Sequence, residues 1–265
     1  IKKETMDACA ERRRAEPRRG YLGMSSIGHP CERQSWFDVN RVPGIPKDGR
    51  GCRIFDMGDA VETRVINDLK LRWKVSDEQA ECMDFGGRFR GHIDGIVWAG
   101  DNGEPMLLEI KSANKDGFAN MRSKGIGFRP QYHAQVVLYM HYMGLSSALF
   151  VVENKNDQEL HMEIVPADPA KAERLKAKAL SVLRSSWPPP ATRGDCYFCD
   201  WRAGPCGRAS RPEHLCMWCS HFASRFVFEE RGTAIANDVC LLDCGAADRW
   251  TGTCEAFSFQ IAPTL

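Results

Sequence analysis

Long apolar runs are missing from this chain of 265 residues. The most apolar stretches, residues 134–142 and 148–152, are far shorter than the roughly 20 residues that a membrane-spanning helix needs. The sequence opens without the charged and then apolar segment of a secretion signal. We therefore expect a cytoplasmic protein, cellular or virus-encoded, that makes no contact with a membrane. No internal repeat is present.

An excess of charge of either sign is missing too. Lys and Arg number 36 against 35 Asp and Glu, a formal net charge of +1. No basic field covers the whole chain, so affinity for DNA has to come from local patches. The leading patch is residues 11–19, which carries Arg12, Arg13, Arg14, Arg18 and Arg19. The alternative for this run is a solvated chain end.

Cysteine, in contrast, is abundant. The chain has 12 cysteines, and they are concentrated after residue 195. Because no secretion signal is seen, disulfides are not expected, and clustered cysteines indicate metal ligation instead.

Hydrophobic periodicity predicts an α/β (α+β) core with a mixed central sheet flanked by helices. Helices are expected at residues 31–39, 54–73 and 131–143, and from an Asp168 N-cap to the proline run at 188–190. Strands are expected at residues 82–85, 88–98, 106–111, 148–153 and 159–165, with a Gly86-Gly87 hairpin turn and a loop over 42–51. The predicted organisation is a charged segment (1–24), a main domain (25–206) and a Cys-rich module (207–265).

The strongest chemical signal lies on two neighbouring predicted strands. Glu109 and Lys111 alternate with apolar residues on one strand, so both side chains share a face. Asp94 interrupts an apolar or small stretch on the strand before. If these strands pair, two carboxylates meet beside a lysine, which is a site for Mg²⁺ or Mn²⁺. Taken singly, each residue is typical of a solvated strand face.

Two helices add candidates to this site. Glu62 falls on the line of Phe55, Val65 and Leu69, where an ionised carboxylate is costly unless it is paired or bound to metal. A surface position at the helix edge is the alternative. Gln135 and Tyr139 are four residues apart and share a helix face, suited to contacts with phosphate or with the catalytic residues.

From about Ser25 to Cys206, this combination resembles the PD-(D/E)xK nuclease superfamily, in particular its RecB-like and phage-exonuclease branches. The resemblance implies a restriction-endonuclease-like core. It implies a metal held by Glu62, Asp94, Glu109 and the main-chain carbonyl of Ile110, with Lys111 as catalytic lysine and Gln135 with Tyr139 as the following motif. Many RecB-like members have His where this chain has Glu62. A glutamate there is more like the viral recombination exonucleases, lambda exonuclease among them.

The cysteines fall into two groups. Cys196, Cys199 and Cys206 lack a fourth thiolate, and Cys31 can supply it. One Cys before the core and three after it resembles the iron–sulfur nucleases of the AddB type and of CRISPR adaptation. That resemblance implies a [4Fe–4S] cluster that closes the domain. Cys216, Cys219, Cys240 and Cys244 fit a Zn²⁺ ribbon, with His214 and His221 as spare ligands. The alternative places Cys196, Cys199, Cys216 and Cys219 around one zinc.

Together these observations predict a metal-dependent deoxyribonuclease, with an exonuclease favoured over an endonuclease, acting in recombination, repair or viral DNA processing. DNA is the expected partner, with a recombination or annealing protein as a further candidate. The alternatives are a CRISPR spacer-acquisition nuclease, a non-catalytic DNA-binding module on the same fold, and a zinc protein for protein–protein contacts.

Overall fold

The computed structural model describes residues 1–16, 19–42, 44–99, 103–186, 188–192, 196, 199–201 and 206, and the backbone of two strands at 222–228 and 234–240. These residues fall into two units, one of residues 1–30 and 46–183, the other of residues 31–45 and 184–265. The predicted boundary at residue 206 lies where few residues are described, so the Cys-rich module stays a prediction.

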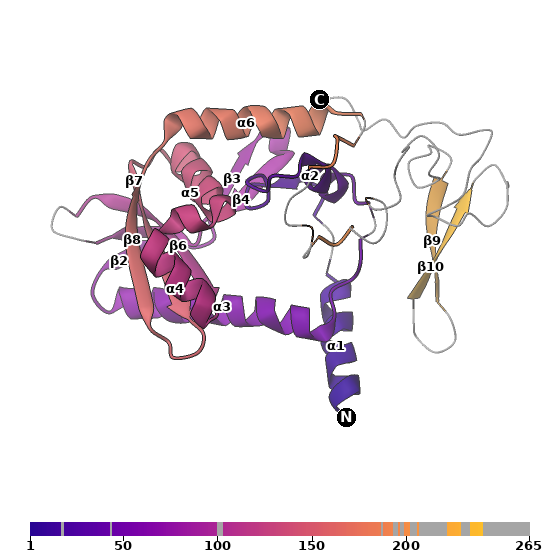
Figure 1. Cartoon of the computed structure of the whole chain (residues 1–265), viewed down its shortest axis with the longest axis horizontal. Coiled ribbons are helices and arrows are strands. Elements are labelled where there is room, and N and C mark those ends of the chain that lie inside the picture. Colours follow the sequence, from indigo (N-terminus) through magenta and orange to yellow (C-terminus); the bar gives the residue numbers. More distant parts are fainter. Residues whose placement is uncertain are drawn as a thin grey trace. The chain divides into compact units, whose positions relative to one another are not determined.

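The predicted α/β class is confirmed (Figure 1). The helices are α1 (Lys2–Arg14), α2 (Glu32–Val39), α3 (Gly49–Lys70), α4 (Lys115–Lys124), α5 (Pro130–Met143) and α6 (Pro169–Arg184), with short 3-10 turns η1 (Phe85–Gly87) and η2 (Ile126–Phe128). The strands are β1 (Leu22–Gly23), β2 (Lys74–Ser76), β3 (Glu81–Asp84), β4 (Phe89–His92), β5 (Gly95–Trp98), β6 (Pro105–Ala113), β7 (Ser147–Asn154), β8 (Leu160–Pro166), β9 (Phe222–Phe228) and β10 (Ala234–Cys240).

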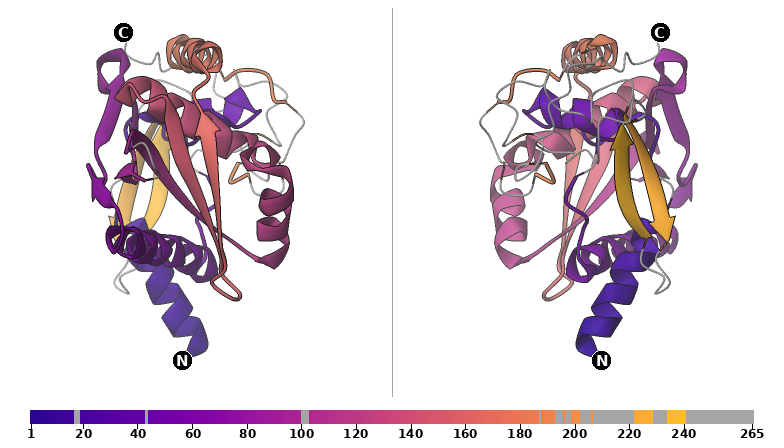
Figure 2. Two further views of the ribbon diagram at one scale, coloured as in Figure 1. Left: turned by 90° about the vertical axis from the view of Figure 1, so that its left-hand side faces the viewer. Right: turned by 90° about the vertical axis from the view of Figure 1, so that its right-hand side faces the viewer.

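The larger sheet of the first unit has the strand order β2-β5-β6-β7-β8 (Figure 2). Its β6 and β7 are parallel and its other neighbours are antiparallel, so the sheet is mixed, as predicted. On β6 the side chains of Met106, Leu108 and Ile110 join the apolar core formed with α3. Glu109 and Lys111 alternate with them and lie on the opposite face, which α5 covers.

The predicted strand 88–98 is wrong in one respect, because the chain changes sheets within it. β4 pairs with β1 and β3 in a small sheet, while β5 belongs to the larger one. Between them the Ile93 N–H donates to the Ala80 carbonyl at 3.1 Å, and Asp94 bonds to β6. The Gly86-Gly87 hairpin is confirmed as the β3–β4 connection, through the turn η1.

Several element bounds differ from the predicted ones. Helix α3 begins at Gly49, inside the predicted loop, because the Asp48 carboxylate caps it by accepting from the Gly51 N–H at 2.7 Å. Helix α6 is capped by Asp168 as predicted, through the Lys171 N–H at 2.8 Å. Helices α1 and α4 and strands β1 and β2 have no counterpart in the prediction.

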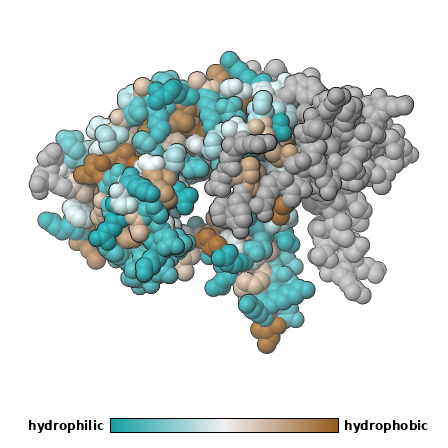
Figure 3. Space-filling model, in the orientation of Figure 1, coloured by the Kyte–Doolittle hydropathy of each residue, from teal (hydrophilic) through white to brown (hydrophobic). Residues whose placement is uncertain are grey.

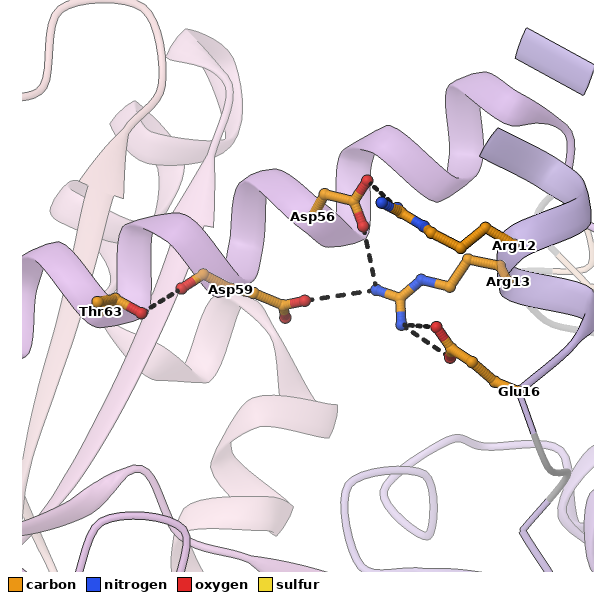
Figure 4. Close-up of polar contacts among 6 residues, drawn as sticks. All are labelled: Arg12, Arg13, Glu16, Asp56, Asp59 and Thr63. Atoms are coloured by element: carbon orange, nitrogen blue, oxygen red, sulfur yellow. Dashed lines mark hydrogen bonds and ion pairs between the residues drawn. The ribbon is translucent and has the colours of Figure 1, made fainter. Parts of the chain in front are cut away.

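The arginine run of residues 11–19 lies partly on α1, and two of its members bind α3 (Figure 4). Arg12 contacts Asp56 at 2.5 Å, and Arg13 contacts Asp56 at 3.5 Å and Asp59 at 3.4 Å. Arg13 also pairs with Glu16 at 3.0 Å. These ion pairs hold this part of the run against α3, while the Arg12 side chain stays 60% exposed. The DNA-binding patch and its alternative, a solvated chain end, both remain predictions.

The second unit is held by tryptophans that bond to main-chain carbonyls. The Trp36 indole donates to the Ser185 carbonyl at 2.8 Å, and the Trp201 indole donates to the Val42 carbonyl at 2.9 Å. The rings of Trp201 and Phe37 lie 5.8 Å apart. These contacts join α2 and the residues after it to Ser185 and Trp201. Strands β9 and β10 pair antiparallel within the same unit.

None of the described helices combines the length and apolarity that crossing a bilayer requires. In the view of Figure 3 the described surface is mainly hydrophilic, with apolar side chains in scattered places.

The crossing of α1 over α3 gives the first prediction. A Cβ added at Gly49 would overlap the main-chain carbonyl of Met6, whereas a Cβ at Gly58 of the same helix meets nothing within 4 Å. Gly49→Ala should therefore destabilise the fold and release α1. Gly58→Ala should stabilise it by about 0.5–1 kcal/mol, because alanine costs less backbone entropy in a helix.

Urea unfolding and limited proteolysis of the two variants measure this difference. A Gly49→Ala protein that is as stable and as protease-resistant at α1 as Gly58→Ala would contradict the close contact.

Candidate functional site

The structure brings Asp94, Glu109 and Lys111 together at the junction of the two sheets. Asp94 lies between β4 and β5, and its Oδ2 accepts from the Ile110 N–H of β6 at 2.6 Å. Glu109 is fully buried in the middle of β6. The Lys111 ammonium, two residues further along the same face, donates to Glu109 Oε1. Two buried carboxylates and a lysine whose side chain is 22% exposed thus share one site.

Burial controls the charges of these groups. It raises the pKa of Glu109 to about 8, although the Lys111 ammonium acts to lower it. The pKa of Asp94 is raised by burial as well, against the same ammonium. Burial acts to lower the pKa of Lys111, but the carboxylates of Glu109 and Asp94 outweigh it and raise that pKa. The lysine is therefore a fixed cation held between two acids.

One oxygen of this group has no partner. Glu109 Oε2 is buried and accepts no hydrogen bond from any residue that the structure describes. A buried carboxylate oxygen in that state costs free energy, because it has left water without compensation. Such an oxygen is available to a cation.

Glu62 lies near the same group. It is half-buried on α3, accepts from Gln79 Nε2 at 2.5 Å, and has its pKa raised to about 7 by burial and by the negative charge of Asp94. The apolar line predicted around it is only partly correct, since Val65 and Leu69 are buried but Phe55 is 51% exposed. Glu62 is assigned to the site because the charges of Asp94 and Lys111 act on its pKa, and not because its surroundings are apolar.

Helix α5 closes the site from above the sheet. Gln135 and Tyr139 are both buried and hydrogen-bonded to each other. Burial, with the charges of Glu109 and Asp94, raises the pKa of Tyr139, which stays a neutral phenol. Tyr139 approaches β4 so closely that a Cβ at Gly91 would lie 2.6 Å from its hydroxyl oxygen. The glycine of the Gly91 to Val97 motif is needed for this approach.

Tyr132 is a member of the group that the sequence prediction missed. Lys111 Nζ lies 5.5 Å from the centre of its ring, a cation–π distance. The ring also packs on Phe150 of β7 at 6.3 Å. The available signal was spacing: Tyr132 stands three residues before Gln135 on the same helix face.

These donors fit a hard divalent cation. Carboxylate oxygens that are buried and incompletely bonded are the ligands that Mg²⁺ and Mn²⁺ take. The Ile110 carbonyl points to the same side of β6 as its N–H, which Asp94 accepts, because both groups of a strand residue point to one edge. Among the described residues no three acidic, His or Cys side chains form a ready cage. The Lys111 ammonium instead donates to Glu109.

The four cysteines predicted for a cluster are all described and belong to the second unit, but they form no ready metal-binding group among the described residues. Burial raises the pKa of Cys199, and the neighbouring Cys206, Cys196 and Cys31 add to the rise. Cys31 is buried and stands at the N-cap of α2. The Cys199 N–H donates to the Cys196 carbonyl at 3.2 Å. Of the second predicted set, Cys216, Cys219 and Cys244 lie outside the described residues, with His214 and His221, and Cys240 is described only in its backbone, at the end of β10.

The fold and site define a mixed α/β protein with a buried acidic pair and a lysine at a junction of sheets. No protein-family model and no curated protein matches the sequence. Among solved structures the chain is similar to a protein named SSO0001, at 16% identity and a TM-score of 0.49 over 77% of this chain and 94% of that one.

It is also similar to an alkaline exonuclease from Laribacter hongkongensis, at 18% identity and a TM-score of 0.48 over 63% of this chain and 87% of that one. A phage-related exonuclease from Haemophilus somnus 129PT matches at 12% identity and a TM-score of 0.43 over 61% and 91% of the two chains. At these values the function of the chain has to be argued from its own residues.

Metal-free protein should lose stability as the pH rises. The pKa of Glu109 is about 8 when folded against an ordinary value of 4.5, so between these values the folded state holds a proton that the unfolded state releases. The stability from this group is fully present below pH 4.5 and is lost as the pH rises through about 8. Glu62 acts in the same direction over a narrower range, with a pKa of about 7.

Thermal unfolding in EDTA across this range tests the point. Glu109→Gln should flatten the fall in melting temperature, and Mn²⁺ should restore the melting temperature of the unchanged protein at the alkaline end. An equal fall in both proteins would show that Glu109 is not the group responsible.

Proposed function

We propose that this chain is a Mg²⁺- or Mn²⁺-dependent deoxyribonuclease of the PD-(D/E)xK kind. The observation that carries the proposal is the unpartnered, buried Oε2 of Glu109 beside Asp94 and Lys111. A purely structural ion pair would satisfy both carboxylate oxygens, since an unmade hydrogen bond in the interior is costly. The unpartnered oxygen therefore supports a cation ligand at Glu109.

Asp94, Glu109 and the Ile110 carbonyl would hold the metal, with Glu62 as the outer ligand. The metal, when bound, would stabilise negative charge on a phosphodiester and lower the pKa of a water. With its oxygens on the metal, Glu109 would no longer accept from the Lys111 ammonium. That ammonium, which lies 5.5 Å from the ring centre of Tyr132, would then be able to orient the attacking water. Gln135 and the neutral Tyr139 fix the wall of the site by their mutual hydrogen bond.

DNA as substrate and an exonuclease mode come from the sequence resemblance, which extends over most of the chain. The spacer-acquisition nuclease has the same core residues, and partner proteins would separate the two. A DNA-holding module without catalysis is the remaining alternative. A module without catalysis does not explain why a buried oxygen of Glu109 lacks a hydrogen-bond partner among the described residues.

Degradation of end-labelled linear and closed-circular DNA with Mn²⁺ or Mg²⁺ tests the proposal. Lys111→Ala should slow cleavage by about 100-fold or more, the usual contribution of a proton-transferring or water-orienting group. Glu109→Gln should abolish it. Loss of linear DNA alone would assign an exonuclease, and nicking of circles an endonuclease.

Glu153→Gln is the matched control. Glu153 is equally buried on the adjacent strand β7, but it faces the other side of the sheet and binds Arg64 with both oxygens. Its variant should lose stability and keep the cleavage rate. If the unchanged protein cuts no form of DNA, the DNA-holding module becomes the better account.

We also propose that Cys31, Cys196, Cys199 and Cys206 ligate a [4Fe–4S] cluster. The support is the rise in the pKa of Cys199, which burial causes and to which the other three thiols add, and the resemblance to iron–sulfur nucleases. Its role would be to join the chain before the core to the chain after it. Zn²⁺ at the same thiols is the alternative, and the further cysteines Cys216, Cys219, Cys240 and Cys244 remain a zinc prediction.

Protein purified without oxygen should absorb broadly near about 400 nm, as thiolate-bound iron–sulfur centres do. Cys199→Ser should remove the absorption and the bound iron. Cys52→Ser, a change at a buried cysteine of α3 outside the group, should remove neither. Colourless protein that carries zinc would contradict the cluster.

A further inference from the structure

A local excess of positive charge lies on α4 and on the turn that leads from it into α5. Between residues 115 and 133 the chain carries Lys115, Arg122, Lys124 and Arg129, and its acid in this stretch is Asp116 alone. The whole chain has a formal net charge of only +1. In a protein of nearly balanced charge, such a stretch is where a polyanion is attracted.

Two of these cations, Lys124 and Arg129, have no carboxylate partner. Both residues are exposed, and neither forms an ion pair with any residue that the structure describes. The Lys124 ammonium donates to the neutral amide oxygen of Asn120 at 2.9 Å. Arg122 of the same helix, in contrast, is paired with Glu159 at 2.6 Å. The charges of Lys124 and Arg129 are therefore available to an anion from outside the chain.

The ring of Phe128 holds these two cations near each other. Lys124 Nζ and the guanidinium carbon of Arg129 each lie 5.1 Å from the centre of that ring, within cation–π range. Two like charges repel, so the shared ring fixes as a pair what would otherwise separate. Cations combined with an aromatic ring are typical of grooves that follow a single nucleic-acid strand.

This pair of cations is continuous with the candidate site. Arg129 is the N-cap of α5, and the Tyr132 N–H donates to its carbonyl at 2.9 Å. Tyr132 is less than one helical turn, about 5 Å along the axis, from Arg129. Its ring lies 5.5 Å from Lys111 Nζ. A strand with one phosphate at Lys111 would therefore bring a neighbouring phosphate toward Arg129.

The start of α5 strengthens the case for an anion at this place. A cation at a helix N-terminus is unfavourable by itself, yet Arg129 stands there, and the first turn of α5 has no acidic residue. Glu163 contacts the turn, but its carboxylate accepts from the Ile126 N–H at 2.8 Å. A Cβ added at Gly127 would meet nothing within 4 Å, so the main chain of the turn is open to approach.

We propose that Lys124 and Arg129 bind the sugar–phosphate backbone of the DNA strand that is cut at Lys111. The inference rests on the proposed nuclease function for the identity of the strand. Contacts of this kind fix the register of a strand on the protein and carry no sequence information. Each cation that neutralises a phosphate releases condensed counterions, so the affinity for DNA falls as salt is added.

Binding of a fluorescent single-stranded oligonucleotide to the full chain tests the proposal. Anisotropy is measured in EDTA, where no cleavage occurs, at several salt concentrations. Arg129→Gln and Lys124→Gln should each raise the Kd and reduce the slope of log K against log salt by about 1, the loss of one phosphate contact. The rise in Kd should be the same for oligonucleotides of different sequence. Arg129→Lys keeps the charge and should keep the slope.

Arg122→Gln is the matched control, because it removes an exposed cation of α4 that is already paired with Glu159. It should leave the slope unchanged. An unaltered slope in both test variants would overturn the proposal, as would an equal reduction in Arg122→Gln or a chain that binds no oligonucleotide. Circular dichroism of each variant separates loss of binding from loss of folding.

The same proteins separate this inference from the nuclease function. Cleavage by the unchanged protein in Mn²⁺, with binding unaffected by either test variant, would leave the nuclease standing and overturn the contact. A reduced slope in both test variants of a protein that cuts no DNA would support the contact and contradict the nuclease.

Discussion

The burial of Asp94 and Glu109 beside Lys111 is the constraint on which the first unit depends. Two buried acids repel each other when ionised and have lost most of their hydration, so each needs compensation within the fold. Asp94 finds it in the Ile110 N–H and Glu109 in the Lys111 ammonium. The mixed sheet supplies both partners, because its central strand carries acid and lysine on one face and apolar side chains on the other.

Other features of the fold cover the group formed by Asp94, Glu109 and Lys111. Helix α5 lays Gln135 and Tyr139 over it, and this cover is close because Gly91 has no side chain. Helix α6 in turn packs on α5, with Lys171 Nζ 2.7 Å from His133 Nδ1. The Lys178 ammonium bonds to the carbonyls of Ile27 and His29, which ties the segment after β1 to the same helix. The site thus rests on layers of packing in which polar groups are mostly paired.

The strongly patterned parts of the fold could be predicted from the sequence. Strands β6, β7 and β8 and helix α5 were placed by their periodicity, and alternation alone put Glu109 with Lys111. Helix α4 was not predicted, because only Phe118 and Met121 of it are buried, and two residues are too few to give a hydrophobic periodicity. The break before β5 escaped because buried residues keep alternating through Ile93, so only the contact between Asp94 and Ile110 reveals the change of sheet. The role of Tyr132 was not predicted, because its contact with Lys111 is made by an uncharged aromatic ring.

That change of sheet has a mechanical consequence. Asp94 stands in the short link between β4 and β5, while Glu109 and Lys111 are rigid parts of the larger sheet. The Ile110 N–H holds Asp94 to β6 at 2.6 Å, so this link is fastened to the larger sheet at the point where the chain leaves the small one. The separation of the two acids is therefore set by the main chain of β6 and not by the position of the small sheet.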